Sequence, residues 1–181
     1  MRNLLEINNH LAIPSPYTLV IKEFNKLNTR DKSKAKEKAL KELAYVYFKC
    51  NHNSPYAIYD GDEKESKIIT SIFGEDSKWS PDEVVEAACK KYLELMDTHA
   101  ILLLKSARKS VKKLEKYFED IDLTLLDDNG KPIYSAKDLV ANLTKVGDVV
   151  LGLSKLEEIV KKEEQERAVT RGGVEVNKYN Q

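Results

Sequence analysis

The sequence predicts an all-α protein, a helical bundle with one long helix, a small β-hairpin and extended termini. Composition supports the helical class, because 33% of the 181 residues are charged and 41% are hydrophobic, whereas seven are glycine and five are proline. Apolar residues recur at spacings of three and four over most of the chain, which is the period of an amphipathic helix. The length suits one domain with a core of its own.

The first part of the chain divides into an arm and three helices. Residues 1–14 have no helical pattern and are expected to form an extended N-terminal arm. A Ser-Pro pair at 15–16 is typical of a helix start, and a short amphipathic helix follows it. A second helix is expected over about 33–48. A third is expected over about 62–73, where Gly74 is placed to end it.

A continuous apolar row predicts the long helix, over residues 84–118. Its start is marked by Ser80, Pro81 and Glu83, which match a capping box with proline at the first helical position. A helix of about 35 residues would be roughly 50 Å long, more than a compact domain of this size needs. We therefore expect part of its surface, near Leu103, to pack against another subunit.

Two further elements are expected after the long helix. Residues 123–134 place an Asn-Gly pair between two apolar runs, which is a strong signal for a β-hairpin. Ser135 is expected to cap the last helix, which carries an apolar face as far as Val160. The helical bundle would then span residues 15–167.

The charges balance, with 30 basic and 30 acidic residues, so no general attraction to nucleic acid or to a membrane is expected. Cys50 and Cys89 are too few for a disulfide framework, which indicates a reducing compartment. The first residues have no long apolar run of the kind that marks a secretory signal. No segment approaches the length and apolar character of a membrane span.

The stretch YVYFKCNHNSPYAIYDGDE, residues 45–63, raises the question of a metal or catalytic site. Cys50 and His52 are suitable ligands, but a structural zinc site needs a second pair, which the sequence does not place nearby. A Cys-His nucleophile pair stays open, although no motif provides an orienting group or an oxyanion hole. The alternative is a turn between two helices, stiffened by Pro55 and the tyrosines. We expect this turn, and no enzymatic activity, metal or cofactor.

Lysine-rich stretches occur at residues 32–41 and 105–116. They fit either a face that contacts nucleic acid or a solvated helix surface. Glutamates interrupt both stretches and no aromatic residues are interleaved for base stacking, which favours the solvated surface.

The end of the chain, residues 168–181, is expected to be a flexible docking tail. Val174 and Val176 alternate at strand spacing after two glycines. One interpretation is simple disorder. The other is a segment that adds a strand to the edge of a partner's sheet.

Four stretches matter by their order and spacing: YVYF running into SPY, then WSPDEVVEAACKKYLEL, DDNGKPIY and the terminal RGG. Together they resemble a family of small virion proteins from crAss-like and related tailed bacteriophages, over residues 39–175. Members of this family are neck components that form a ring below the portal. The resemblance implies a structural subunit that connects the portal to the tail and continues the DNA channel, and it brings no catalytic residues.

The resemblance also implies partners and a location. The protein partners would be copies of the chain in a ring, the portal protein and other neck or tail proteins. Double-stranded DNA would pass through the ring without sequence preference. No contact with a membrane is expected. The location would be the virion, assembled in the cytoplasm of the bacterial host. A helical binding module or regulator acting in the infected cell is the alternative function.

Two sets of residues are candidates for these contacts. The partner-binding residues expected in the tail are Arg171, Gly172, Gly173, Val174, Val176 and Tyr179. The residues expected to line a DNA channel, because mobile lysines bind phosphate without reading sequence, are Lys105, Lys109, Lys112 and Lys113.

Overall fold

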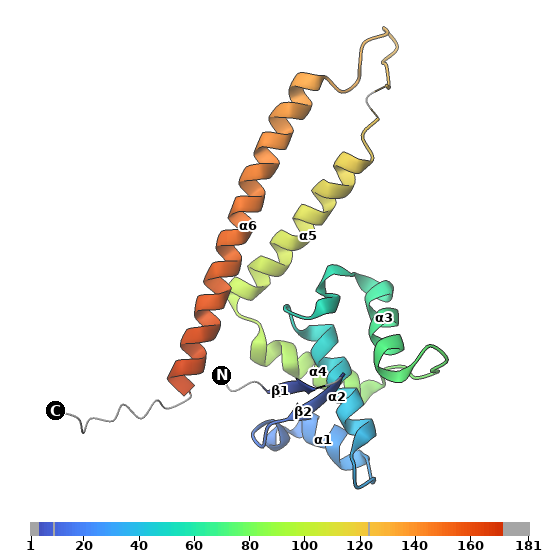
Figure 1. Ribbon diagram of the computed structural model, residues 1–181, viewed down its shortest axis with the longest axis vertical. Coiled ribbons are helices and arrows are strands. Elements are labelled where there is room, and N and C mark those ends of the chain that lie inside the picture. The colour runs from blue at the N-terminus through green and yellow to red at the C-terminus, as the bar shows by residue number, and fades with distance from the viewer. Residues whose placement is uncertain (1–3, 9, 123, 172–181) are drawn as a thin grey trace, which may run out of the picture. The chain divides into compact units, whose positions relative to one another are not determined.

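The computed structural model describes residues 4–8, 10–122 and 124–171, which are mostly helical with a small two-stranded antiparallel hairpin (Figure 1). The predicted helical class is therefore confirmed. The chain divides into two compact units where one bundle was expected, the first formed by the chain up to Asp97 together with residues 167–171 and the second by Thr98–Glu166.

The first unit is built around one central helix. In chain order its elements are β1 (Leu5–Asn8), β2 (Leu11–Pro14), a 3-10 helix (Thr18–Val20), α1 (Lys22–Arg30), α2 (Glu37–Cys50), a second 3-10 helix (Pro55–Ile58), α3 (Gly61–Phe73) and α4 (Glu83–Met96). Helix α2 contacts α1, α3, α4 and both strands. It consequently supplies most of the buried side chains of this unit.

The N-terminal segment is a β-hairpin rather than a simple extended arm. Strands β1 and β2 pair antiparallel, with Leu5 opposite Pro14 and Asn8 opposite Leu11. His10, in the turn, adopts a left-handed backbone conformation with φ of 63°. Leu5 and Ala12 are buried against the helices. Burial of one face of the hairpin explains why this segment is ordered despite the absence of a helical pattern.

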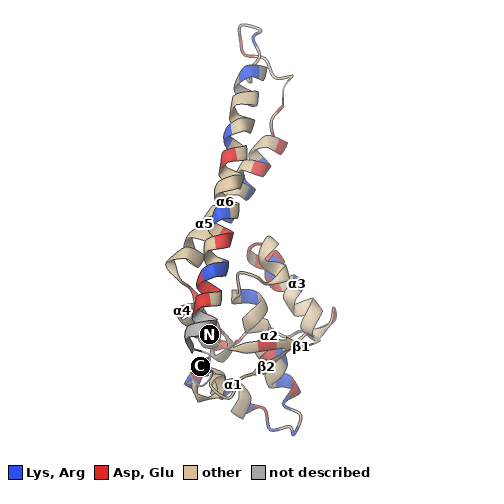
Figure 2. Ribbon diagram, turned by 60° about the vertical axis from the view of Figure 1, so that its left-hand side comes forward, with Lys and Arg blue, Asp and Glu red and all other residues tan. Residues whose placement is uncertain are grey.

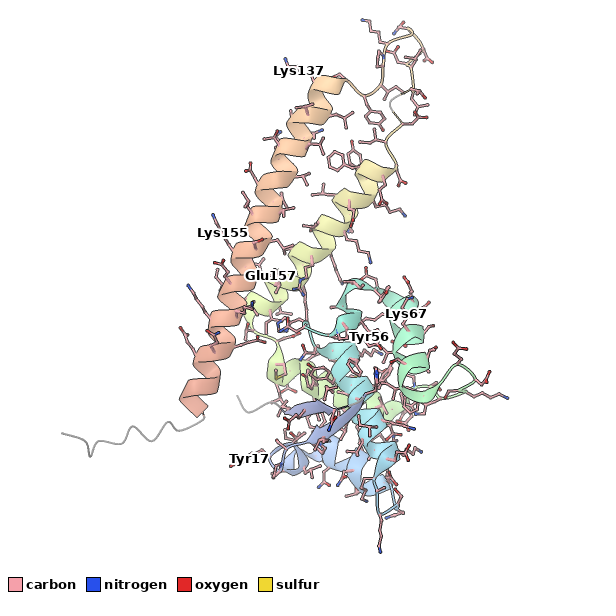
Figure 3. The ribbon with its side chains drawn as sticks, viewed as in Figure 1. Tyr17, Tyr56, Lys67, Lys137, Lys155 and Glu157 are labelled. Carbon is pink, nitrogen blue, oxygen red and sulfur yellow. The ribbon has the colours of Figure 1, made fainter. Side chains whose placement is uncertain are left out.

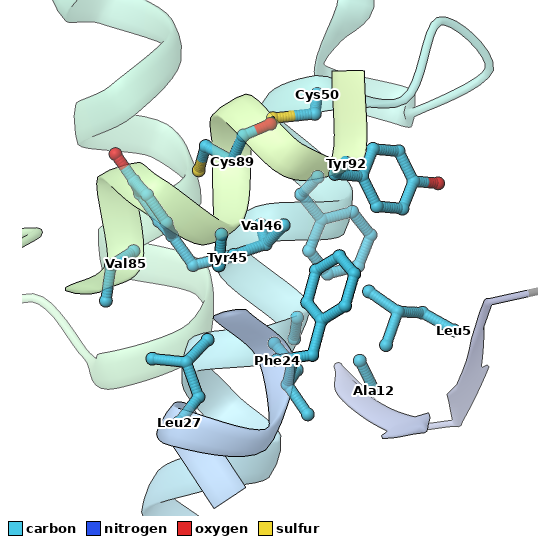
Figure 4. Close-up of a cluster of buried hydrophobic side chains, with 14 of the residues drawn as sticks. Leu5, Ala12, Phe24, Leu27, Tyr45, Val46, Cys50, Val85, Cys89 and Tyr92 are labelled. Carbon is cyan, nitrogen blue, oxygen red and sulfur yellow. The ribbon is translucent and has the colours of Figure 1, made fainter. Parts of the chain in front are cut away.

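The core of the first unit combines aliphatic and aromatic side chains (Figure 4). Phe24, Leu27 and Tyr45 are fully buried there. The ring of Trp79 stacks on Phe73, with centroids 4.1 Å apart, and meets Tyr45 edge-on at 4.8 Å. Aromatic pairs in these geometries add to the stabilisation that burial alone provides.

Helix α2 begins about four residues later than the sequence predicts. Its preceding residue, Lys36, has a left-handed backbone with φ of 53°, so residues 33–36 cannot continue the helix toward the N-terminus. The carboxylate of Asp31 accepts hydrogen bonds from the backbone N–H groups of Ser33 at 2.9 Å and Ala39 at 3.1 Å. Asp31 thereby holds the loop against the first turn of α2.

The prediction of one long helix over residues 84–118 is wrong. The segment forms α4 and then α5 (His99–Glu119), with a break at Asp97 and Thr98. The Thr98 hydroxyl accepts a hydrogen bond from the backbone N–H of Ile101 at 3.1 Å, which caps the new helix. The start of α4 also differs, because Asp82 and not Ser80 caps it, accepting from Val85.

The predicted hairpin over residues 123–134 is reduced to a single bridge between Leu126 and Pro132. The backbone N–H of Asp127 donates to the carbonyl oxygen of Lys131 at 2.7 Å, and that of Ile133 donates to Leu125 at 3.0 Å. A strand ladder does not extend further, because proline has no N–H to donate.

The second unit is a helical hairpin. Helix α5 and the residues of α6 (Ala136–Arg171) up to Glu166 run side by side and antiparallel, joined by the loop that carries this bridge (Figure 1). Helix α6, with 36 residues, is the longest helix that the structure describes. It continues through the charged segment after Val160 and takes in residues 168–171, which the sequence assigned to the tail.

Candidate interaction surfaces

The end of α2 contains the residues that the sequence offers as a metal or catalytic site. The Cys50 thiol donates to the carbonyl oxygen of Cys89, 3.7 Å away, and both cysteines are buried and free. The side-chain amide of Asn51 donates to the Tyr92 hydroxyl at 2.9 Å and its oxygen accepts from the backbone of Asn53 at 2.7 Å. These bonds tie the turn after α2 to α4.

Cys50, His52 and Ser54 at this turn are buried. No group of three or more His, Cys, Asp or Glu side chains in the described parts of the chain is arranged to hold a metal ion. The neighbouring Cys50 thiol and burial raise the pKa of the Cys89 thiol, which keeps it protonated and a poor nucleophile. The sequence did not indicate that the two cysteines are neighbours, because they lie on helices that pack only in the folded chain.

An ion-pair network links three helices of the first unit. The guanidinium of Arg30 lies 2.6 Å from the buried carboxylate of Glu42 and 2.5 Å from that of Asp82. Burial lowers the pKa of Arg30, but the two carboxylates outweigh burial and raise it above its usual value. The network joins α1, α2 and the start of α4.

A second network lies between α2, α3 and α4. The Lys49 ammonium lies 2.6 Å from the Glu65 carboxylate and 2.9 Å from that of Glu86. It also lies 5.4 Å from the centroid of the Tyr45 ring. Burial lowers the pKa of Lys49, whereas these carboxylates raise it by more. Both networks stabilise packing between helices, and the sequence did not predict either.

The four lysines expected to line a channel all lie on α5. Lys105 is half-buried, whereas Lys109, Lys112 and Lys113 are exposed. Their spacing places them on one side of the helix, and we call them the lysine stripe. Helix α5 carries six basic and two acidic side chains, a net charge of +4, and basic positions recur along the second unit (Figure 2).

The helical hairpin buries few apolar side chains. Among the described residues of the second unit only Ile101, Leu104 and Val160 are buried, with Leu153 and Leu156 partly buried beside them. The unit nevertheless carries twelve of the sixteen large hydrophobic side chains that the described residues expose. A unit with this balance has apolar surface available for another protein.

Polar contacts fix the register of the two helices. The Arg108 guanidinium lies 2.8 Å from the Glu157 carboxylate, and the Thr98 hydroxyl donates to the Glu163 carboxylate at 2.9 Å. Figure 3 shows Glu157 pointing toward α5, whereas Lys155 points away from it. One face of each helix is therefore occupied within the hairpin and the other faces are not.

The residues predicted to bind partners in the tail fall at the end of the described chain or beyond it. Arg171 ends α6, which places its backbone in a helix and not in an extended segment. The others, Gly172, Gly173, Val174, Val176 and Tyr179, lie outside the described residues.

Comparison of the chain with protein-family models, with curated proteins and with solved structures found no match. No helix in the described part of the chain combines the length and apolar character needed to span a membrane.

Proposed function

We propose that the chain is a structural subunit of a phage virion neck, in which copies form a ring that connects the portal to the tail and continues the DNA channel. The observation that supports an assembling subunit is the helical hairpin, whose described residues include three buried hydrophobic side chains and twelve exposed large ones. Exposed apolar surface on this scale is typical of a protein–protein interface.

The physical reason to expect an interface on the hairpin is the conformational entropy that is lost when two long helices form. Each residue fixed in a helix loses conformational entropy worth about 1–2 kcal/mol, which burial of apolar surface must offset. A small contact between α5 and α6 buries little, so packing against other subunits would supply the rest. A subunit designed to work alone would gain nothing from this surface.

The proposal gives each region of the chain a role. The order and spacing of the motifs that resemble phage neck proteins support the ring and its place between the portal and other neck or tail proteins. The lysine stripe would face double-stranded DNA in the channel and contact phosphates without sequence preference. The tail, from Gly172, would dock on a neighbouring ring. The role needs no catalytic residue and no membrane.

A mass measurement of the purified protein, alone and mixed with its portal protein, tests the proposal. We expect a closed ring in at least the mixture, and the protein in purified virions. A chain that stays monomeric in both samples and is absent from virions would contradict the proposal. That result would favour a helical binding module or regulator acting in the infected cell.

A further inference from the structure

The two cysteines of the chain meet in the core of the first unit. Cys50 lies in the last turn of α2 and Cys89 in the middle of α4, 39 residues further along the sequence. Both are buried, and the sequence has no other cysteine. A buried cysteine can act simply as a small apolar side chain. Two cysteines placed at random on a chain of this length would seldom be in contact, so their meeting points to a shared role.

The packing of α2 against α4 brings the two thiols close together. The Cys50 Sγ lies 3.7 Å from the carbonyl oxygen of Cys89, and Figure 4 shows both side chains in the same part of the core. A carbonyl oxygen lies about 2.4 Å from the Cα of its own residue, so the Cys50 sulfur is within about 6 Å of the Cys89 Cα. The Cα atoms of a disulfide are usually about 4–7 Å apart. Rotation of the two side chains can therefore join the sulfurs without a rearrangement of the helices.

We propose that Cys50 and Cys89 form a redox-sensitive latch, in which a disulfide bond joins α2 to α4 once the protein meets an oxidising environment. This inference rests on the proposed function, because a virion protein is assembled in the reducing cytoplasm of the host and later leaves it. Thiols are kept reduced in the cytoplasm, whereas disulfides persist outside the cell. The latch would be open during assembly and closed in the released particle.

A peroxide is an oxidant small enough to react with a buried pair. The Cys50 sulfur attacks one oxygen of hydrogen peroxide, the O–O bond breaks, and a sulfenic acid and one water molecule form. The Cys89 sulfur then attacks the Cys50 sulfur, the S–O bond breaks, and the hydroxyl leaves with the Cys89 proton as a second water molecule. Two thiols thus lose two electrons to one peroxide, and the products are one disulfide and two water molecules.

The environment of the thiols makes the reaction slow. The neighbouring Cys50 thiol and burial raise the pKa of the Cys89 thiol. Since the thiolate is the reactive form, few molecules are ready to react at any moment. Brief contact with oxidants during assembly would leave the pair reduced, whereas long exposure outside the host would close the latch.

The disulfide would strengthen a junction that ion pairs also hold. The Lys49 ammonium of α2 lies 2.9 Å from the Glu86 carboxylate of α4, and both side chains are partly exposed. Salt screens such a pair, whereas a covalent bond is independent of ionic strength. The bond also closes the segment that contains α3 into a loop, which lowers the conformational entropy of the unfolded chain. A closed latch would keep the first unit folded in media of varying salt content.

Oxidation of the purified full-length chain tests the reaction without a ring. The chain is treated with hydrogen peroxide, unfolded and alkylated, so that any remaining thiol is labelled. After digestion, we expect the peptides that contain Cys50 and Cys89 as one disulfide-linked pair from a monomeric chain. Recovery of both thiols in alkylated form, or of sulfinic acid in place of the disulfide, would overturn the latch.

The melting temperature measures what the bond does to the fold. The oxidised wild type should melt at least about 5 °C above the same chain kept under a reducing agent. Cys50→Ala and Cys89→Ala are the matched controls, because each keeps one thiol and cannot form the bond. Their melting temperatures should be the same in both conditions. Absence of a rise in the wild type, or an equal rise in the controls, would overturn the stabilising role.

The redox state of the pair in the particle separates the latch from the proposed function. With rapid alkylation, we expect both thiols to be reduced in infected cells and joined in purified virions. A reduced pair in virions that contain the protein would overturn the latch and leave the neck function intact. Absence of the protein from virions would overturn the proposed function and the role of the latch in the particle, whereas the peroxide test would still decide whether the two thiols react.

Discussion

The guanidinium of Arg30, in the last turn of α1, lies 2.6 Å from the carboxylate of Glu42, whose side chain is almost completely buried in α2. The same guanidinium reaches Asp82, the residue that caps α4. One side chain therefore joins three helices, and Glu42 is the buried member of the network.

Replacing Glu42 by Gln is expected to lower the free energy of unfolding of the first unit by about 2–3 kcal/mol. The reason is that the partly buried guanidinium of Arg30 would lose a charged partner. Removing one member of a buried ion pair is strongly destabilising, because the other charge stays buried without compensation. Urea unfolding followed by fluorescence of Trp79, the single tryptophan, reports on this unit. The control is Glu37→Gln in the exposed pair with Lys41, expected to cost less than about 0.5 kcal/mol. Equal losses in the two variants would contradict the role of the network.

Asp31 is expected to make the first unit sensitive to acid. Hydrogen bonds from the backbone of Ser33 and Ala39 lower the pKa of Asp31 from 3.8 to about 2. Since the pKa is lower in the folded state, this stabilisation is fully present above about pH 4 and is lost as pH falls toward 2. Asp31→Asn should be less stable at neutral pH and should lose less stability between pH 4 and 2.

Chemical denaturation at a series of pH values measures this difference. Lys32→Gln, next to Asp31, leaves both hydrogen bonds in place and should keep the wild-type pH dependence. Parallel curves for Asp31→Asn and the wild type would show that this carboxylate is not responsible.

The lysine stripe is expected to contact DNA in the assembled ring. Combined replacement of Lys109, Lys112 and Lys113 by Gln should weaken binding of short duplex DNA and make it less dependent on salt, because fewer counterions are released. Binding constants measured over a range of salt concentrations give the slope. The control replaces the exposed Lys32, Lys34 and Lys38 by Gln, which removes the same charge from the first unit. Equal effects of the two triple variants would argue against a channel lined by α5.

Removal of residues 172–181 is expected to abolish attachment to the neighbouring ring without affecting the folding of the chain. Because α6 continues to Arg171, the truncation is placed after that residue and leaves the helix complete. The shortened chain should keep its helical content and melting temperature but fail to attach to its neighbouring ring, since avidity of many tails would be lost. Circular dichroism and co-sedimentation with the portal measure the two properties. Attachment at full occupancy would show that docking lies elsewhere.

Local signals predicted several elements of the fold well. The third helix was expected over 62–73 and spans Gly61–Phe73, with Gly74 at its end at a positive φ of 95°. Glycine at a helix end acts through its own backbone, so this signal needs no distant partner. The break before Thr98 was missed although a capping residue was present, because the apolar spacing runs on across it.

The tertiary structure decided which helix surfaces pack against one another. Cys50 and Cys89 are neighbours, and Arg30 bridges α2 and α4, because helices distant in sequence pack together. The lysine stripe could be foreseen, since its residues share one helix, but the sides of α5 and α6 that the hairpin leaves exposed became apparent only once its inner sides were known. The sequence by itself determined the helical class, most helix positions and the zero net charge, because these depend on residues three or four positions apart and on composition. The tertiary structure decided the N-terminal hairpin, the division at Asp97 and the apolar sides left uncovered, because these depend on which distant side chains exclude water from one another.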